Sequence, residues 1–238
     1  MGPGRRAGRN RGTVQESVPV DATAGLAMLA GLLAGAAVGP LADRLATNAP
    51  LHQPLLVAVP RSSRFLLVLG GTAVLGGAAG LAFGLTFEAA IAAIFCWILV
   101  VVTRTDLEHR LIPNHVVLPG TAIILAGRTL DDPSFGWLAA ALVAAGVLFV
   151  IALIYPRGMG MGDVKLAGFL GAGLGASVAV ALFLGFLAAL VPAAVILVRH
   201  GRAGRKKAIP LGPFLALGGV VALFVGDEIF SWYLDLGR

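Results

Sequence analysis

The sequence predicts an all-α protein, a polytopic bundle of helices that cross a membrane. Of its 238 residues, 58% are hydrophobic and only 13% are charged, whereas a soluble domain usually carries about 25% charged residues. The mean hydropathy is +0.92. One globular core cannot hide so much apolar surface, because a sphere of this size needs more polar covering. The composition therefore favours a membrane protein, and the apolar runs along the chain predict about eight spans, with seven as the alternative.

Apolar runs long enough to cross a bilayer, about 20 residues each, follow one another along the chain. Charged residues are confined to the junctions between these runs. The run from Val164 to Val198 is too long for one span. Its glycine-rich first part, about 164–176, is therefore expected to form an eighth, short span or a re-entrant segment. The longer spans are expected at about 21–40, 65–84, 87–104, 114–130, 137–155, 177–198 and 211–227.

The N-terminal residues 1–20 are rich in glycine and arginine and hold few apolar residues, so they are expected to be a disordered basic tail. This tail with the first apolar run could also be a cleaved signal peptide, but the run is long and lacks a clear cleavage site. Residues 21–238 are expected to form a single membrane-embedded domain, since no connection is long enough to fold alone.

Lysine and arginine next to membrane spans set orientation, and this use accounts for the net charge of +6 without nucleic acid. The loop 199–210 holds five of these residues, so we expect it to lie in the cytoplasm. With eight spans, the segments 41–64, 105–113 and 156–163 fall on the same side. Four arginines in the N-terminal tail argue instead for a cytoplasmic N-terminus and an odd number of spans.

Acidic residues are scarce in this chain, which makes their positions informative. Most of the twelve, such as Asp43 and Asp227, are expected at loops, tails or span ends, where water solvates them. Asp106 follows the apolar run Ile94–Val102, and Asp163 ends a Gly-x-Gly-Asp segment. Both are expected where a span meets the cytoplasmic face. Two carboxyls brought together there would share one proton, because like charges at close range cannot both ionise.

Such a pair can perform acid–base catalysis. The ionised carboxylate takes a proton from water, and the protonated carboxyl polarises a scissile carbonyl. Gly160 and Gly162 leave no side chain beside Asp163, so an extended substrate backbone can approach it. The alternative is structural, since aspartate is also a good N-cap residue for a helix that begins near Val164.

Three segments of the chain, in order, resemble the type IV prepilin peptidases, membrane aspartic proteases of the Gly-x-Gly-Asp class. The resemblance covers about 94–218, roughly half of the chain, and this part is expected to be the peptidase core. The segment Gly160–Leu166 is the most specific of the three. The segments are Asp106 with Leu111-Ile112-Pro113-Asn114, Gly160-Met161-Gly162-Asp163-Val164-Lys165-Leu166, and Ile209-Pro210-Leu211-Gly212-Pro213-Phe214-Leu215-Ala216.

This resemblance implies a multi-pass enzyme of the bacterial plasma membrane that cuts a short basic leader from prepilins or pilin-like secretion proteins. The cut falls after a glycine, on the cytoplasmic side of the substrate's hydrophobic helix. The expected partners are this substrate and the lipid bilayer, and no cofactor or metal is expected. The resemblance implies a catalytic pair and four supporting residues: Asp106 and Asp163, with Gly160, Gly162, Lys165 and Pro113.

The chain departs from the longer members of this family, which carry a cysteine-containing cytoplasmic insertion and also methylate the new N-terminus. Here the corresponding loop, 41–64, is short and has no cysteine, and Cys96 lies in an apolar run. We therefore expect peptidase activity and doubt N-methyltransferase activity.

Other residues give weaker support to other functions. A zinc protease would need His-Glu-x-x-His, whereas Glu108, His109 and His115 have the wrong order and are expected in a solvated loop. Ser177 lacks a Gly-x-Ser-x-Gly elbow and is expected to pack between helices. Acids in a glycine-rich bundle also occur in transporters, so a transporter or a non-catalytic scaffold is the alternative function.

Overall fold

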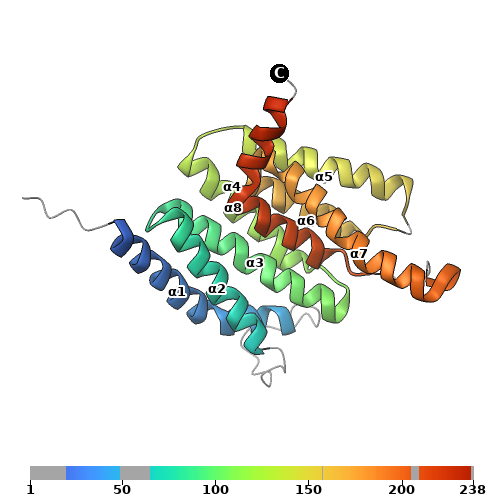
Figure 1. Cartoon of the computed structure of the whole chain (residues 1–238), viewed down its shortest axis with the longest axis horizontal. Helices are drawn as coiled ribbons and strands as arrows, with labels where there is room; N and C mark the ends of the chain where they lie inside the picture. The colour runs from blue at the N-terminus through green and yellow to red at the C-terminus, as the bar shows by residue number, and fades with distance from the viewer. Residues whose placement is uncertain (1–19, 49–64, 157, 205–208, 237–238) are drawn as a thin grey trace, which may run out of the picture.

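The computed structural model describes residues 20–48, 65–156, 158–204 and 209–236, and it contains no strand in these ranges. The all-α prediction is therefore confirmed. Predictions about residues 1–19, most of the loop 41–64 and residues 205–208 lie outside the described residues. The elements are α1 (Val20–Asn48), α2 (Phe65–Phe83), α3 (Phe87–His109), α4 (Asn114–Asp131), α5 (Gly136–Ile154), α6 (Met161–Leu174), the 3-10 turn η2 (Gly175–Ser177), α7 (Val178–Gly204) and α8 (Gly212–Leu236) (Figure 1).

Six segments of the described chain are long and apolar enough to cross a membrane, and together they hold every helix except α4. The helix α4 forms at the predicted residues, but polar side chains such as Asn114 and Arg128 lower its apolarity. The long run 161–201 is broken at Gly175, where φ is +58°. The break produces the short helix α6 and the longer helix α7, as the length of the run predicted.

The corner between α3 and α4 is fixed by local sequence. Helix α3 begins after Thr86, whose Oγ1 accepts the Ala89 N–H at 3.1 Å, a typical N-cap bond. It ends at Arg110 in the left-handed region, with φ of 52°. Helix α4 begins directly after Pro113, whose carbonyl accepts the Val117 N–H at 3.0 Å. The last turn of α3 therefore lies next to the first turn of α4.

Successive helices run in opposite directions, as close approaches between them show. For example, α2 runs opposite to α1, because Gly31 lies against Gly76 while Gly39 lies against Leu69. Helix α8 also runs opposite to α3, because Gly219 lies against Leu99 while the Gly212 N–H bonds to Asp106. This alternation puts the end of α3 and the beginnings of α4, α6 and α8 at one end of the bundle. We call it the Asp106 end and the opposite one the Arg128 end.

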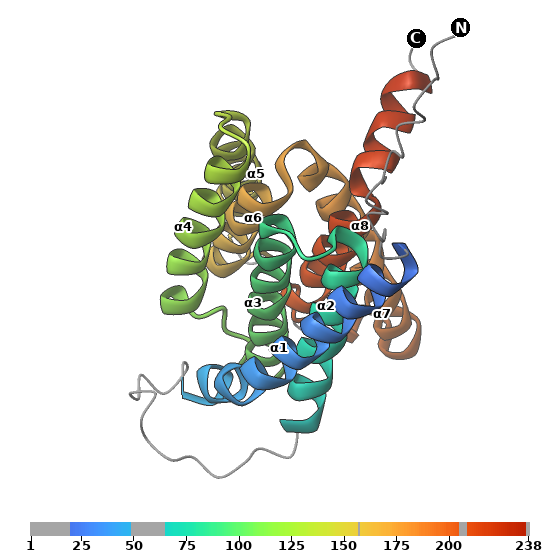
Figure 2. The same cartoon turned by 90° about the vertical axis from the view of Figure 1, so that its left-hand side faces the viewer.

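The helix α3 lies at the centre of the molecule. Helices α1 and α2 pack on one side of it, and α4, α5 and α6 lie on the other (Figure 2). The rings of Phe95 and Phe169 stack in the core between α3 and α6, with centroids 5.0 Å apart. Helix α6 is buried over most of its surface, as expected for a helix that is apolar all round.

At the Arg128 end, the buried guanidinium of Arg128 joins four helices. Its Nε donates to the Gly173 carbonyl of α6 at 3.0 Å, and an Nη donates to Glu88 of α3 at 3.2 Å. The guanidinium also lies 5.1 Å from the centre of the Trp137 ring of α5. A buried charge is tolerated when it is paired and hydrogen-bonded in this way.

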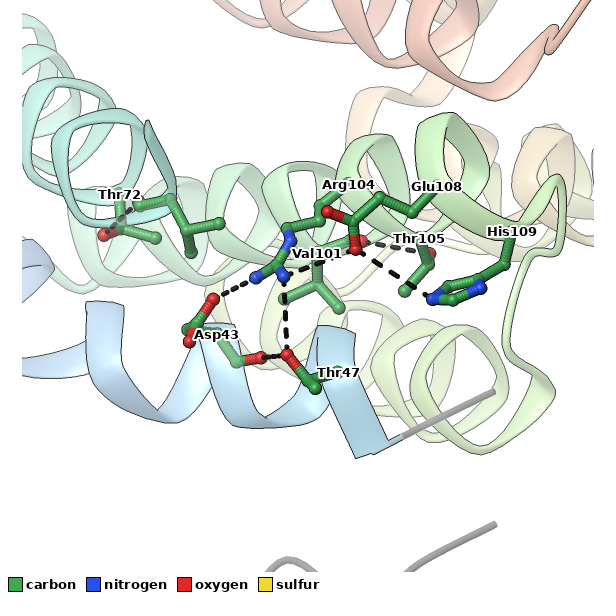
Figure 3. A network of polar contacts seen from close by, with 9 residues as sticks. Asp43, Thr47, Thr72, Val101, Arg104, Thr105, Glu108 and His109 are labelled. Carbon is green, nitrogen blue, oxygen red and sulfur yellow. Dashed lines mark hydrogen bonds and ion pairs between the residues drawn. The ribbon is translucent and has the colours of Figure 1, made fainter. Parts of the chain in front are cut away.

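At the Asp106 end, a second buried arginine joins α1 to α3. Arg104 points from α3 toward α1, where its guanidinium pairs with the Asp43 carboxylate and lies 3.4 Å from Thr47 Oγ1 (Figure 3). Glu108, one turn further along α3, approaches the same guanidinium at 3.3 Å and His109 at 3.9 Å. The prediction that Asp43 and Glu108 are solvated in loops was wrong, because both lie in helices that extend beyond the predicted spans.

Substituting a glycine at the α1–α2 contact should destabilise the bundle. A Cβ at Gly35 would lie 2.1 Å from the Thr72 carbonyl oxygen, so Gly35→Ala should force the two backbones apart. Overpacking of this kind costs about 1–3 kcal/mol, which thermal unfolding in detergent would measure. The matched control is Gly70→Ala, since a Cβ there meets nothing within 4 Å. Equal melting temperatures for the two variants would contradict this packing.

The Arg104–Asp43 pair should show strong coupling. Asp43→Leu leaves the buried guanidinium without its main counter-charge, and breaking a buried pair costs about 3–5 kcal/mol. The double variant Asp43→Leu/Arg104→Met removes both charges and should recover much of this loss. Denaturant titration would measure the effect, with the exposed Arg44→Gln as the control. A double variant as unstable as Asp43→Leu would argue against a paired arginine.

Candidate active site

Asp106 lies in the last turn of α3 and is 6% exposed. Its Oδ2 accepts the backbone N–H of Gly212, the first residue of α8, at 2.9 Å. The beginning of a helix has free N–H groups and a partial positive charge, and both favour a carboxylate there. Asp106 is thus a residue of α3 whose carboxylate contacts the N-terminus of α8.

Asp163 lies in the first turn of α6. Its Oδ2 accepts the N–H of Gly160, the N-cap residue, at 3.1 Å. Asp163 is therefore the third residue of α6. The structural alternative, an N-cap role in a helix that begins near Val164, was wrong, because the helix begins at Met161 and its N-cap residue is Gly160. The contact with Gly160 uses only one carboxyl oxygen of Asp163. This contact and a catalytic role are compatible, because the other lone pairs remain available to a further partner.

Both carboxyls line the same cavity, of about 280 Å³, and they interact electrostatically across it. The two predicted aspartates, contributed by different helices, are therefore brought together at the Asp106 end. Helices α4, α6 and α8 all begin here, so three sets of helix N-terminal N–H groups face this region. The cavity is lined by Asp106, Arg110, Leu111, Ile112, Asn114, Gly160, Met161, Gly162, Asp163 and Lys165.

The four residues predicted to support the pair all lie at or beside this cavity. Gly160 donates to Asp163, and Gly162 approaches Ile112 so closely that a Cβ would lie 3.0 Å from the Ile112 Cβ. Pro113 precedes α4 and is buried. The Lys165 ammonium donates to Asn114 Oδ1 at 2.8 Å. This contact of Lys165 joins α6 to the first residue of α4.

Two residues at the site were missed by the sequence prediction. Gly212 belongs to a segment that carried the resemblance, but no role was assigned to it. A Cβ there would lie 2.8 Å from Asp106 Oδ2, so only glycine allows this approach. Arg110 lines the cavity and interacts electrostatically with Asp106. Arg110 lies four residues after Asp106 in the chain, and this short spacing could have identified it as a site residue. No local feature of the sequence connects Gly212 to Asp106.

The residues of the competing functions are used elsewhere. Glu108 and His109 form part of the Arg104 network, and Ser177 donates to Asp227 at the Arg128 end. Within the described ranges, no group of three or more histidine, cysteine, aspartate or glutamate side chains could hold a metal ion. The chemistry that this site offers is that of two carboxyls beside a cavity large enough for water and a peptide group.

Comparison with known proteins relates this chain to a family of leader peptidases. The sequence profile of the type IV leader peptidase family matches residues 93–198, a range that contains both aspartates. The chain is also similar to proteins named prepilin leader peptidase/N-methyltransferase. It is 37% identical to the one from Bacillus subtilis (strain 168) over 170 residues, which are 69% of this chain and 67% of that protein.

Two further relatives carry the same name. The protein from Aeromonas hydrophila is 35% identical over 74% of this chain, and the one from Pseudomonas aeruginosa is 35% identical over 72%. These alignments span 63% and 62% of the two relatives, so the chain covers somewhat less than two thirds of their length. No solved structure matches the chain. On the profile match and these identities, the chain belongs to the type IV leader peptidase family.

Proposed function

We propose that this chain is a membrane aspartic endopeptidase in which Asp106 and Asp163 form the catalytic pair. The observation that carries the proposal is their common cavity, to which α3 and α6 each contribute one carboxyl. Its position at the end of the bundle allows water to reach the pair, while a transporter would need its acids nearer the middle of the bilayer. We place the peptidase core at about 94–218.

In the proposed reaction, the pair holds one proton and titrates as a unit. The ionised carboxylate takes a proton from water as the water oxygen attacks the carbonyl carbon of the scissile bond. The protonated carboxyl meanwhile donates a hydrogen bond to the carbonyl oxygen. The C–N bond then breaks, the leaving amine takes a proton, and the pair again holds one proton.

The proposed substrate is the leader of a prepilin or pseudopilin, in keeping with the names of the relatives. We orient the Asp106 end toward the cytoplasm, because cytoplasmic junctions are enriched in lysine and arginine. The helix ends and corners on this side hold four such residues, Arg44, Arg110, Lys165 and Arg199. The membrane would be the bacterial plasma membrane.

The proposal covers hydrolysis alone. The relatives' name also includes N-methyltransferase, but the cysteine pairs of the longer family members have no counterpart here. Cys96, the one cysteine of the chain, is buried in α3.

Asp106→Asn and Asp163→Asn should each abolish leader cleavage while the protein still accumulates in membranes. An amide cannot exchange the proton that the reaction requires, and the loss of a general acid or base typically costs about 10²–10⁴-fold in rate. Release of the leader from a full-length prepilin in detergent would measure this. The control is Asp131→Asn, an exposed residue at the Arg128 end. Normal cleavage by either active-site variant would refute the assignment and favour a scaffold or transporter.

Gly212→Ala should lower kcat, because the new Cβ would lie 2.8 Å from Asp106 Oδ2 and displace the carboxylate. A misplacement of about 1 Å can cost about 10²-fold in rate. Steady-state kinetics with the same prepilin would separate kcat from KM. Gly146→Ala is the control, since a Cβ at Gly146 meets nothing within 4 Å. An unchanged kcat for Gly212→Ala would show that the Gly212 contact is dispensable.

A further inference from the structure

A second hollow lies beside the catalytic cavity, between α2 and α8, with α3 as its floor. Its volume is about 370 Å³ and its lining is almost entirely apolar. Figure 1 shows α3 lying between α2 and α8. We call this hollow the α2–α8 groove; its main lining residues are Leu67, Gly71, Leu99, Thr103, Ala216 and Leu217.

One end of the groove reaches the catalytic pair. Leu107 and Pro213 line the groove, and they directly follow Asp106 and Gly212 in the chain. The hydrogen bond from Gly212 to Asp106 therefore lies beside this end of the groove, and Asp106 itself lines the polar cavity. A chain that passes from one hollow to the other would pass close to this hydrogen bond.

We propose that the α2–α8 groove binds the hydrophobic helix of the substrate, on the C-terminal side of the scissile bond. This inference rests on the proposed peptidase function. The groove follows α3 from Leu99 to Leu107, about 12 Å or two helical turns at 1.5 Å per residue. An apolar helix seated here would continue directly from a peptide bond held at Asp106.

The walls of the groove suit a helix that arrives from the membrane. Leu67 and Leu217 on the two rims are 73% and 54% exposed, so the groove is open toward the side of the bundle. Gly71 and Ala216 are small, which permits the close approach of helices that membrane interfaces favour. A Cβ at Gly71 would meet only the Val100 side chain, at 3.5 Å, so the space above Gly71 is open.

A comparable hollow along α7 provides the matched control. It measures about 360 Å³, and its lining includes Phe186 and Ala193 of α7 with Ile209 and Leu211 from the segment before α8. It includes no residue of α3 and neither aspartate. Lipid chains would fill both hollows alike, whereas a substrate helix connected to Asp106 would use only the α2–α8 groove.

The kinetic test fills each hollow in turn. Gly71→Leu and Ala216→Phe fill the groove, and Ala193→Phe fills the control hollow. With a full-length prepilin in detergent, each groove variant should raise KM at least about tenfold, equivalent to ~1.4 kcal/mol, while Ala193→Phe should not. With a short peptide that holds the leader and scissile bond but no hydrophobic helix, the groove variants should keep their kcat/KM within about twofold of the unsubstituted enzyme.

A crosslinking test does not depend on turnover. In an Asp163→Asn, Cys96→Ala background, Leu217→Cys should form a disulfide with a cysteine in the hydrophobic segment of the prepilin, and Ala193→Cys should not. Crosslinking at Ala193→Cys alone, at both positions equally, or at neither would overturn the groove assignment, as would an unchanged KM in both groove variants. If the unsubstituted enzyme cleaves neither substrate, the peptidase proposal fails instead, and the crosslinking pattern still decides whether the groove binds the helix.

Discussion

The hydrogen bond from the Gly212 amide to the Asp106 carboxylate is the contact on which the site depends. It joins the beginning of α8 to the last turn of α3, two segments far apart in the chain. It supplies a donor to a buried carboxylate, and a buried polar group without a partner costs about 1–3 kcal/mol or more. The same contact lies beside residues that line the polar cavity and residues that line the apolar groove. On the proposed function, a bound chain would change environment near this contact.

Much of the fold could be predicted because the membrane imposes simple rules on sequence. A span needs a long apolar run, and charged residues collect at its ends. These rules predicted the helices α2, α4 and α5 almost to their bounds and the beginning of α3. The length of the run after Asp163 predicted the break that the structure places at Gly175. They also predicted that Asp106 and Asp163 lie at one end of the bundle, since two predicted spans, 114–130 and 137–155, separate them.

The buried charges could not be predicted in this way. Asp43 was expected at a loop, tail or span end, where water solvates such groups, and Arg104 is the last residue of the predicted span 87–104. The structure pairs them inside the bundle because α1 continues past Pro40 to Asn48 and packs against α3. Arg128 lies near the end of the predicted span 114–130, but its burial against Gly173 and Trp137 depends on how α5 and α6 pack. Such contacts depend on tertiary packing, about which local apolarity and charge say nothing.

The two hollows differ in polarity, and this difference bears on how a cleavage position could be chosen. The cavity contains the aspartates, Arg110 and Lys165, whereas the groove offers almost only apolar atoms. Seating a charged leader in the groove would desolvate its charges, and moving the hydrophobic helix into the cavity would expose apolar surface to water. On the proposed function, a substrate with a basic leader followed by an apolar helix therefore has its lowest free energy when the junction between them lies at Asp106. The enzyme would select the scissile bond by this junction, with little need to recognise the side chains around it.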